Sequence, residues 1–241
     1  LALTAQQKAI AIQEKMLGKE HADVSVSYTN LATIYQNMDK LPLALTAQQK
    51  AIAIQEKKLN KNHPNLMASY SNLAGIYQVM GKLPLALVYQ QKTIAICEKV
   101  MGKKNAELAT CYNNLAGIYQ SMDNLTLSLS YQQKAVAIQE KMLDNPNVNL
   151  ATFYHNLSNV YQAINNLPLA LEYQQKAIAI QEKVLDKDHP DLATSYHNLS
   201  NIYRAMGNLP LALDYQQKAI AIRKEVLDKD HPDLASSYNN L

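Results

Sequence analysis

Histidine, which can bind a metal or transfer a proton near neutral pH, recurs in this chain at one position of a repeated segment. These histidines are His21, His63, His189 and His231. Successive repeats of packed helices lie roughly 10 Å apart, whereas a metal–nitrogen bond measures about 2 Å. The same spacing separates His155 from His197. We therefore predict that the loop histidines cap helices, and that the chain has no metal site.

Other catalytic signatures are missing from the sequence. There is no HExxH, P-loop or GxSxG motif, and the two cysteines, Cys97 and Cys111, form no cluster of ligand spacing. Glutamates recur, each with a lysine after it, at Glu14, Glu56, Glu98, Glu140 and Glu182. This pattern indicates a solvated helix face and not an acid–base pair. The sequence predicts no enzyme and no cofactor.

Composition narrows the class of protein further. With 48% hydrophobic residues the chain can build a core, and a net charge of +3 favours neither nucleic acid nor anionic lipid as a partner. No run approaches the ~18 apolar residues of a membrane span. Two cysteines suit a reducing compartment. We expect a cytoplasmic (intracellular) location, and we expect an excised fragment, because the chain starts without methionine inside an apolar-periodic segment.

A repeat of 42 residues organises the whole chain. The segment LALTAQQKAIAIQEK returns five times, so that units start at Leu1, Leu43, Leu85, Leu127, Leu169 and Leu211. Residues 169–199 and 211–241 are identical at 25 of 31 positions. We predict one continuous repeat array over 1–241, the last unit being truncated.

Each unit predicts two helices. Over 190–206, apolar residues recur at steps of four and three, as on one face of an α-helix. Gly207 should end this first helix, and Asp39, Asp123 or Asn165 should do so in other units. A second helix is predicted over 169–185. Its polar residues are expected to face water: Gln174, Gln175, Lys176, Gln181 and Lys183. The tyrosines fall in three columns and predict packing between helices.

These features resemble the tetratricopeptide repeats, and especially the longer repeats of kinesin light chains. The residues that carry the resemblance in one unit are Tyr196, Leu199, Tyr203, Gly207, Ala212 and Ala219, together with the strings NNLAGIYQ (113–120) and DKDHPDLATSY (186–196). The resemblance implies an all-α, right-handed superhelical solenoid of antiparallel helix pairs. It departs from the family where small residues other than glycine follow the conserved leucine, as at Ser158 and Ser200, and where Gln216 replaces an aromatic residue.

The resemblance also implies a binding groove, lined by the first helix of each pair, for a protein or an extended peptide. An asparagine column is identical in every unit: Asn30, Asn72, Asn114, Asn156, Asn198 and Asn240. Asparagine can donate to and accept from a peptide backbone, or it can instead satisfy a neighbouring helix end. Neighbouring columns supply further candidates: Asn113, His155, His197, Asn159, Asn201, Gln120, Gln162 and Arg204. Gly75 and Gly117, in one of these columns, indicate either close approach of a ligand or slack in the array.

Two alternatives remain open. Near-identical units with unpaired ends favour a structural spacer or rod that associates end to end or by domain swapping. The array could also be the sensor part of a larger signalling protein. Neither alternative involves nucleic acid or a membrane.

Overall fold

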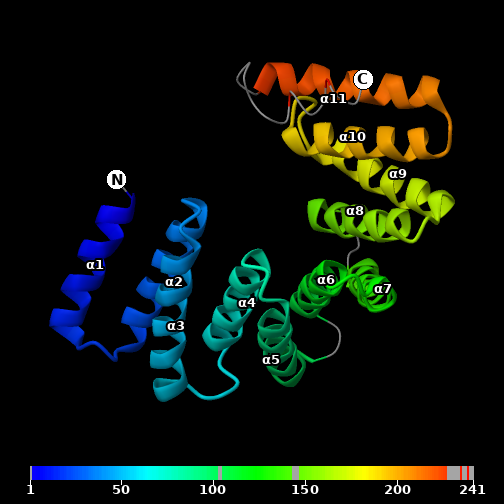
Figure 1. The fold of residues 1–241 in the computed structure, drawn as a ribbon. Helices are drawn as coiled ribbons and strands as arrows, with labels where there is room; N and C mark the ends of the chain where they lie inside the picture. Colours follow the sequence, from blue (N-terminus) through cyan, green and yellow to red (C-terminus); the bar gives the residue numbers. More distant parts are fainter. Residues whose placement is uncertain (1, 103–104, 143–146, 227–233, 235–237, 239–241) are drawn as a thin grey trace. The chain divides into compact units, whose positions relative to one another are not determined.

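A computed structural model describes residues 2–102, 105–142, 147–226, 234 and 238. In this part of the chain the secondary structure consists of α-helices, without a strand. The helices, labelled in Figure 1, are α1 (Ala2–Leu17), α2 (Ala22–Asn37), α3 (Leu41–Lys58), α4 (Pro64–Val79), α5 (Leu83–Met101), α6 (Ala106–Ser121), α7 (Leu125–Met142), α8 (Val148–Ala163), α9 (Leu167–Val184), α10 (Pro190–Ala205) and α11 (Leu209–Val226).

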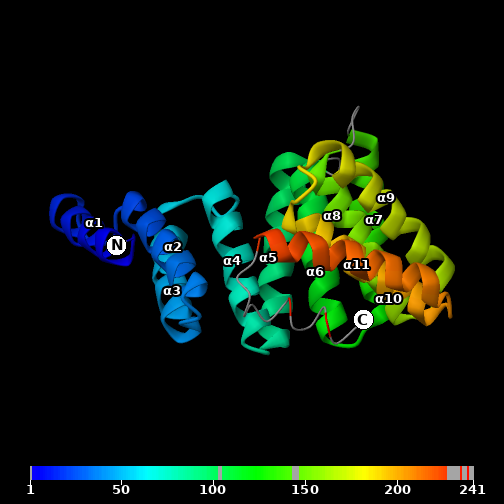
Figure 2. The same ribbon diagram turned by 90° about the horizontal axis from the view of Figure 1, so that it is seen from above.

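The helices form two compact units, residues 1–123 and 124–241. In the first unit α2 packs on α3 and α4 on α5, and in the second unit α8 packs on α9 and α10 on α11. Each pair combines a first helix (α2, α4, α8, α10) with the second helix that follows it, as Figure 2 shows for α10 and α11. The predicted all-α architecture of packed helix pairs is confirmed. That one array runs without a break over 1–241 stays a prediction.

The loop histidines cap first helices, as predicted. The Nδ1 atoms of His21, His63 and His189 accept hydrogen bonds from backbone N–H groups two residues later, at 3.1–3.2 Å. Such bonds satisfy N–H groups that have no partner inside the helix. His231 lies outside the described residues.

The first helices end in the left-handed conformation that the sequence predicted. Asp39, Asp123 and Asn165 have φ angles of 55–59°, and Gly81 and Gly207 have 70° and 77°. Aspartate and asparagine tolerate this region better than most side chains, although glycine adopts it without a Cβ clash. A short turn then leads the chain back along the helix it has just left.

Tyrosines fill the space inside each helix pair. Tyr89 of α5 lies against Tyr70 and Tyr77 of α4, with its ring centroid 5.7 Å from each. Tyr173 and Tyr215 repeat this arrangement with the two tyrosines of their own first helices, at 5.5–5.9 Å. Tilted and offset rings at these distances are favourable. The three tyrosine columns are therefore packing positions.

A buried glutamine joins each second helix to the next first helix. Gln48 of α3 is fully buried, and its Nε2 donates to the carbonyl oxygen of Ser69 in α4 at 3.1 Å. The same bond, always 21 residues apart, joins Gln6 to Ser27, Gln90 to Cys111, Gln132 to Phe153 and Gln174 to Ser195. The prediction that Gln174 and Gln181 face water is wrong, since they are only 0% and 5% exposed. A second helix packs against two first helices, so a polar residue between them is enclosed.

Tyrosine hydroxyls make two further bonds across the same junction. Tyr70 of α4 donates to Glu56 Oε1 of α3 at 2.6 Å, and Tyr77 accepts from Gln49 Nε2 at 3.2 Å. Both bonds recur in other units at constant separations of 14 and 28 residues. The recurring glutamates, predicted to be a solvated face, are thus also partners of buried tyrosines.

Serine replaces alanine at one close contact of the second unit. Ser158 and Ser200, which are 0% and 4% exposed, donate through Oγ to the carbonyl oxygens of Ala170 and Ala212 at 2.7 Å. These bonds join a first helix to the second helix of its own pair. Serine is larger than the glycine that is usual in the family at this position, and it fits because its hydroxyl donates to a backbone carbonyl.

Candidate functional site

The predicted groove residues lie on the first helices of both units. Four members of the asparagine column, Asn72, Asn114, Asn156 and Asn198, are half-buried, and Asn30 is exposed. Asn240 lies outside the described residues. We call the surface formed by these columns the first-helix face.

In the second unit the predicted residues of this face bond to one another. Asn198 Nδ2 of α10 lies 3.1 Å from His155 Nε2 of α8, so the face is continuous between two first helices. Along α10, Arg204 donates to Asn201 Oδ1 at 2.9 Å, and Asn201 Nδ2 lies 3.2 Å from His197 Nε2. The structure therefore brings these five side chains together.

The network selects one tautomer of the neutral His197 ring. Because Asn201 accepts from Arg204 through its oxygen, its Nδ2 donates, and His197 Nε2 must accept. The proton of the neutral ring is then on Nδ1, which lies 3.0 Å from Gln216 Oε1 and donates to it. Gln216, the residue that departs from the family pattern, thus orients His197.

His155 is held in its neutral form. Burial lowers its pKa, an effect partly opposed by hydrogen bonding toward Gln174 and by the charge of Asp191. A neutral imidazole can accept through Nε2 from the amide of Asn198. At neutral pH His155 therefore adds no charge to this end of the first-helix face, and the charge beside it is that of Asp191.

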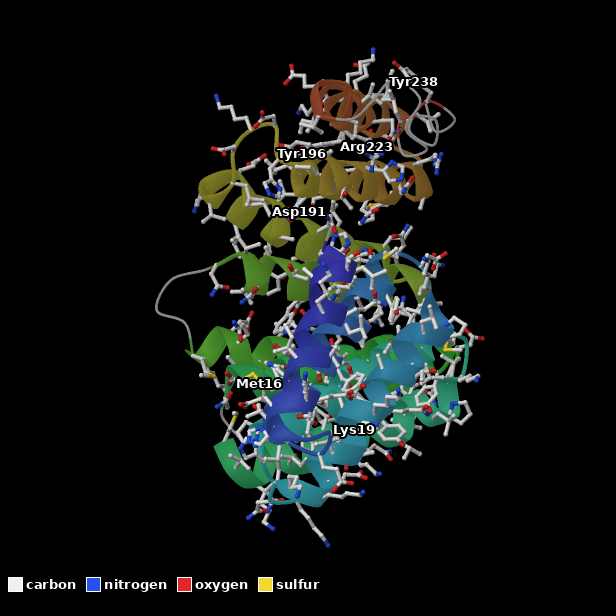
Figure 3. The ribbon with its side chains drawn as sticks, turned by 90° about the vertical axis from the view of Figure 1, so that its left-hand side faces the viewer. Met16, Lys19, Asp191, Tyr196, Arg223 and Tyr238 are labelled. Carbon is white, nitrogen blue, oxygen red and sulfur yellow. The ribbon has the colours of Figure 1, made fainter. Side chains whose placement is uncertain are left out.

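A small pocket opens between α8 and α10 beside His155. Its volume is about 140 Å³, and it is lined by Thr152, His155, Gln181, Asp191, Thr194 and Ser195. Figure 3 labels Asp191 near the start of α10. The threonine hydroxyls donate to backbone carbonyls one turn earlier, which leaves their oxygens to accept. Sequence reasoning missed Thr152, Asp191 and Thr194, although Thr152 and Thr194 share one column, one turn before His155 and His197.

In the first unit the corresponding amides are available. Within the described residues, the side chains of Asn72 and Asn114 form no hydrogen bond, although both are half-buried. Beside them, Gln78 Nε2 donates to Ser121 Oγ at 3.1 Å. No atom lies within 4 Å of a Cβ built on Gly75, and at Gly117 only Gln78 comes within 3.6 Å. Packing does not require these glycines.

The remaining predicted residues lie on the first helices but do not come together at one point. Asn113 and Asn156 are half-buried and have partners; Asn159 and Gln162 are half-buried; Gln120 is exposed. All belong to the same helix faces as the residues above. The first-helix face is polar. Within its predicted columns the cationic side chain is Arg204.

The two cysteine thiols are buried, and the residue types that bind metals are scattered over the described residues. Burial raises the pKa of Cys97, and raises that of Cys111 to about 12, so both thiols are protonated at neutral pH. In the described ranges, no three His, Cys, Asp or Glu side chains are grouped to bind a metal ion. No described helix is long and apolar enough to cross a membrane.

A family model for the tetratricopeptide repeat matches residues 1–57, 23–78, 65–141, 149–225 and 193–241. The chain belongs to the tetratricopeptide repeat family. Tetratricopeptide repeats are helical scaffolds that generally mediate protein interactions. No match was found among curated proteins.

Solved tetratricopeptide structures share this fold. BtubC (BKLC) from P. vanneervenii is 19% identical, covers 96% of this chain and 92% of its own, and superposes with a TM-score of 0.78. A Podosopora anserina protein of nearly identical, kinesin-light-chain TPR-like repeats is 28% identical over 86% of this chain and 99% of its own, with a TM-score of 0.71. The apo form of RapI is 17% identical over 83% and 70%, with a TM-score of 0.71.

Proposed function

We propose that the first-helix face of this tetratricopeptide array binds an extended peptide segment of another protein. The observation that carries the proposal is the unbonded, half-buried state of the Asn72 and Asn114 amides, at a position that is asparagine in every unit. An amide offers one acceptor and two donors, so a row of amides can hold a peptide backbone whatever its sequence. Asparagine inside a helix costs about 0.5 kcal/mol or more relative to alanine, and a ligand would offset that cost.

The second unit supports the proposal in a different way. There the amide of Asn198 is engaged by His155, and a pocket of about 140 Å³ lies beside it. Such a pocket has room for one side chain of the bound segment. We therefore treat each unit as a binding surface of its own: the first holds a peptide backbone through its amides, and the second selects a side chain at this pocket.

The proposal can be tested with a displayed library of random peptides. Peptides enriched on the wild-type chain should bind the variant Asn72→Ala/Asn114→Ala about tenfold more weakly, which is the loss of about 1.4 kcal/mol. Asn37→Ala, at an exposed asparagine at the end of α2, is the matched control and should bind like the wild type. Equal affinity of the double variant for every enriched peptide would refute the assignment.

Self-association is a second candidate because α1 exposes large apolar side chains. Ile12 is 59% and Met16 is 77% exposed, and Figure 3 labels Met16 near the end of this helix. Sedimentation velocity over a wide concentration range tests this candidate. A rod would show mass increasing with concentration, and Ile12→Ser/Met16→Ser would abolish the increase. A constant monomer mass excludes it.

A further inference from the structure

Two pockets of the same design lie in the first compact unit, away from the asparagine columns. One has a volume of about 400 Å³ and is lined in part by Glu14, Tyr28, Lys50 and Ile54. The other has a volume of about 390 Å³ and is lined by the residues 42 positions later, Glu56, Tyr70, Lys92 and Ile96. Each pocket therefore lies where two second helices meet the first helix between them.

The floor of each pocket is apolar. Ile54 and Ile96 are only 8% and 6% exposed, and Tyr70 is 7% exposed. The tyrosine hydroxyls do not point a free donor into the pocket, because Tyr28 and Tyr70 donate to their glutamates at 2.8 and 2.6 Å. What the floor offers to a ligand is aliphatic and aromatic surface.

A lysine stands over each floor. Lys50 Nζ lies 5.3 Å from the ring centroid of Tyr28, and Lys92 Nζ lies 5.1 Å from that of Tyr70. Neither ammonium forms an ion pair with a described residue within 4 Å, and the residues four positions earlier, Thr46 and Val88, have no charge. Attraction to a ring face leaves most of a lysine's charge available to an anion.

Two helices of the second compact unit differ at this very point. There the equivalent lysines are paired on their own helices, Lys176 with Glu172 at 2.6 Å in α9 and Lys218 with Asp214 at 2.9 Å in α11, whereas Lys134 of α7 has Ser130 four positions earlier. The lysine is thus neutralised by a carboxylate one turn earlier in α9 and α11 and not in α3 and α5. Lys19 and Lys61 also line the two pockets of the first unit and add positive charge to them (Figure 3 labels Lys19), while Glu20 in the first pocket is paired with Lys57 at 2.6 Å.

We propose that these two pockets form a second binding surface, which takes an acidic peptide segment of a partner protein. Carboxylates of the segment pair with Lys50 and Lys92, and its aliphatic side chains cover Ile54 and Ile96. The apolar floor selects a peptide over a bare phosphate backbone, which has no side chain to place there. Because exposed ion pairs contribute little affinity, the lysines supply selectivity and association rate, while the side chains of the segment fill the two pockets. This surface is built on the second helices and does not depend on the asparagine face.

The test uses a short fluorescein-labelled peptide of alternating leucine and glutamate, titrated with the whole chain and followed by fluorescence anisotropy. We expect it to bind at least about tenfold more tightly than the same peptide with glutamine for glutamate. The variant Lys50→Met/Lys92→Met should lose about tenfold in affinity for the acidic peptide, and added salt should weaken the wild type toward the variant.

Two matched variants keep the result decisive. Lys176→Met/Lys218→Met removes the paired lysines of the second unit and should stay within about twofold of the wild type. Thr46→Glu/Val88→Glu keeps Lys50 and Lys92 but supplies the carboxylates that the second unit has, and it should weaken binding as the methionine variant does. It reports on the proposal even if the methionine variant fails to fold.

Equal binding of the neutral peptide, equal loss from both lysine pairs, or equally tight binding of a single-stranded oligonucleotide would overturn the proposal. The Asn72→Ala/Asn114→Ala variant should bind the acidic peptide normally, which separates this surface from the asparagine face.

Discussion

The hydroxyl of Tyr70 in α4 donates a hydrogen bond to Glu56 Oε1 of α3 at 2.6 Å, so a buried tyrosine bonds this repeat to the one before it. Burial, followed by this glutamate, raises the pKa of Tyr70, and the same causes raise the pKa of Tyr28 to about 12. The bond is present only while the tyrosine keeps its proton. The hydrogen bond between the repeats is therefore lost when alkaline pH removes the tyrosine proton.

Stability should fall as pH rises above about 10, the pKa of tyrosine in an unfolded chain. Above that pH the unfolded chain has lost the proton that the folded chain retains, so unfolding becomes easier with each further increase. Urea unfolding at pH 8 and pH 11 measures the change. Tyr70→Phe should be less stable than the wild type at pH 8 but should lose less stability on going to pH 11. Equal losses in the two proteins would contradict the linkage.

The buried glutamine column should contribute more to stability than its polarity suggests. Gln48→Ala removes a buried donor to the carbonyl of Ser69 and leaves a cavity, which should cost about 1–3 kcal/mol of unfolding free energy. Gln217→Ala, an exposed glutamine of α11, should change it by less than about 0.5 kcal/mol. Urea titrations of both variants measure the difference. Similar values would mean that Gln48 is not held as described.

His155 should titrate below the pKa of a free imidazole, because burial favours its neutral form. The unfolded chain binds its proton first as pH falls below about 6.5, so stability present above that pH is lost on acidification through the folded pKa. Protonation also removes the acceptor that Asn198 uses. NMR titration of the imidazole, together with the side-chain amide of Asn198, measures both events. An imidazole pKa at or above 6.5 would be inconsistent with this burial.

Asp39 ends α2 in the left-handed conformation, with φ 55°. Asp39→Gly should raise the unfolding free energy by up to about 1 kcal/mol, since glycine lacks the Cβ that is strained there. Asn37→Gly, two residues earlier and still helical, should lower it by about 0.3 kcal/mol. Thermal unfolding of the two variants should shift in opposite directions. Parallel shifts would show that backbone strain at Asp39 is negligible.

The fold was predictable because its signals are local and repeated. The period located each helix pair, Asp39 and Asn165 marked helix ends, and His63 and His189 marked helix starts. Hydrophobic patterning treats every glutamine as a surface residue, and for this reason it missed the burial of Gln174. Its enclosure depends on a neighbouring first helix, which no local pattern encodes.

The candidate site was predictable only in part. The asparagine column could be read from the repeat, and the structure places its described members on the first-helix face. The bond between Asn198 and His155 could not be predicted from the sequence, because it joins residues 43 positions apart through the geometry of two helices. The sequence alone does not indicate that Lys50 lacks an ion pair. Once the Lys176–Glu172 pair is known, Thr46 in place of an acidic residue shows it.

The most direct test of peptide binding on the first-helix face is NMR observation of the side-chain amides during titration with a library-selected peptide. The proposal predicts that the amide signals of Asn72 and Asn114 shift or broaden in proportion to bound peptide, while that of Asn37 does not. Unchanged signals for Asn72 and Asn114 at saturation would contradict the proposal.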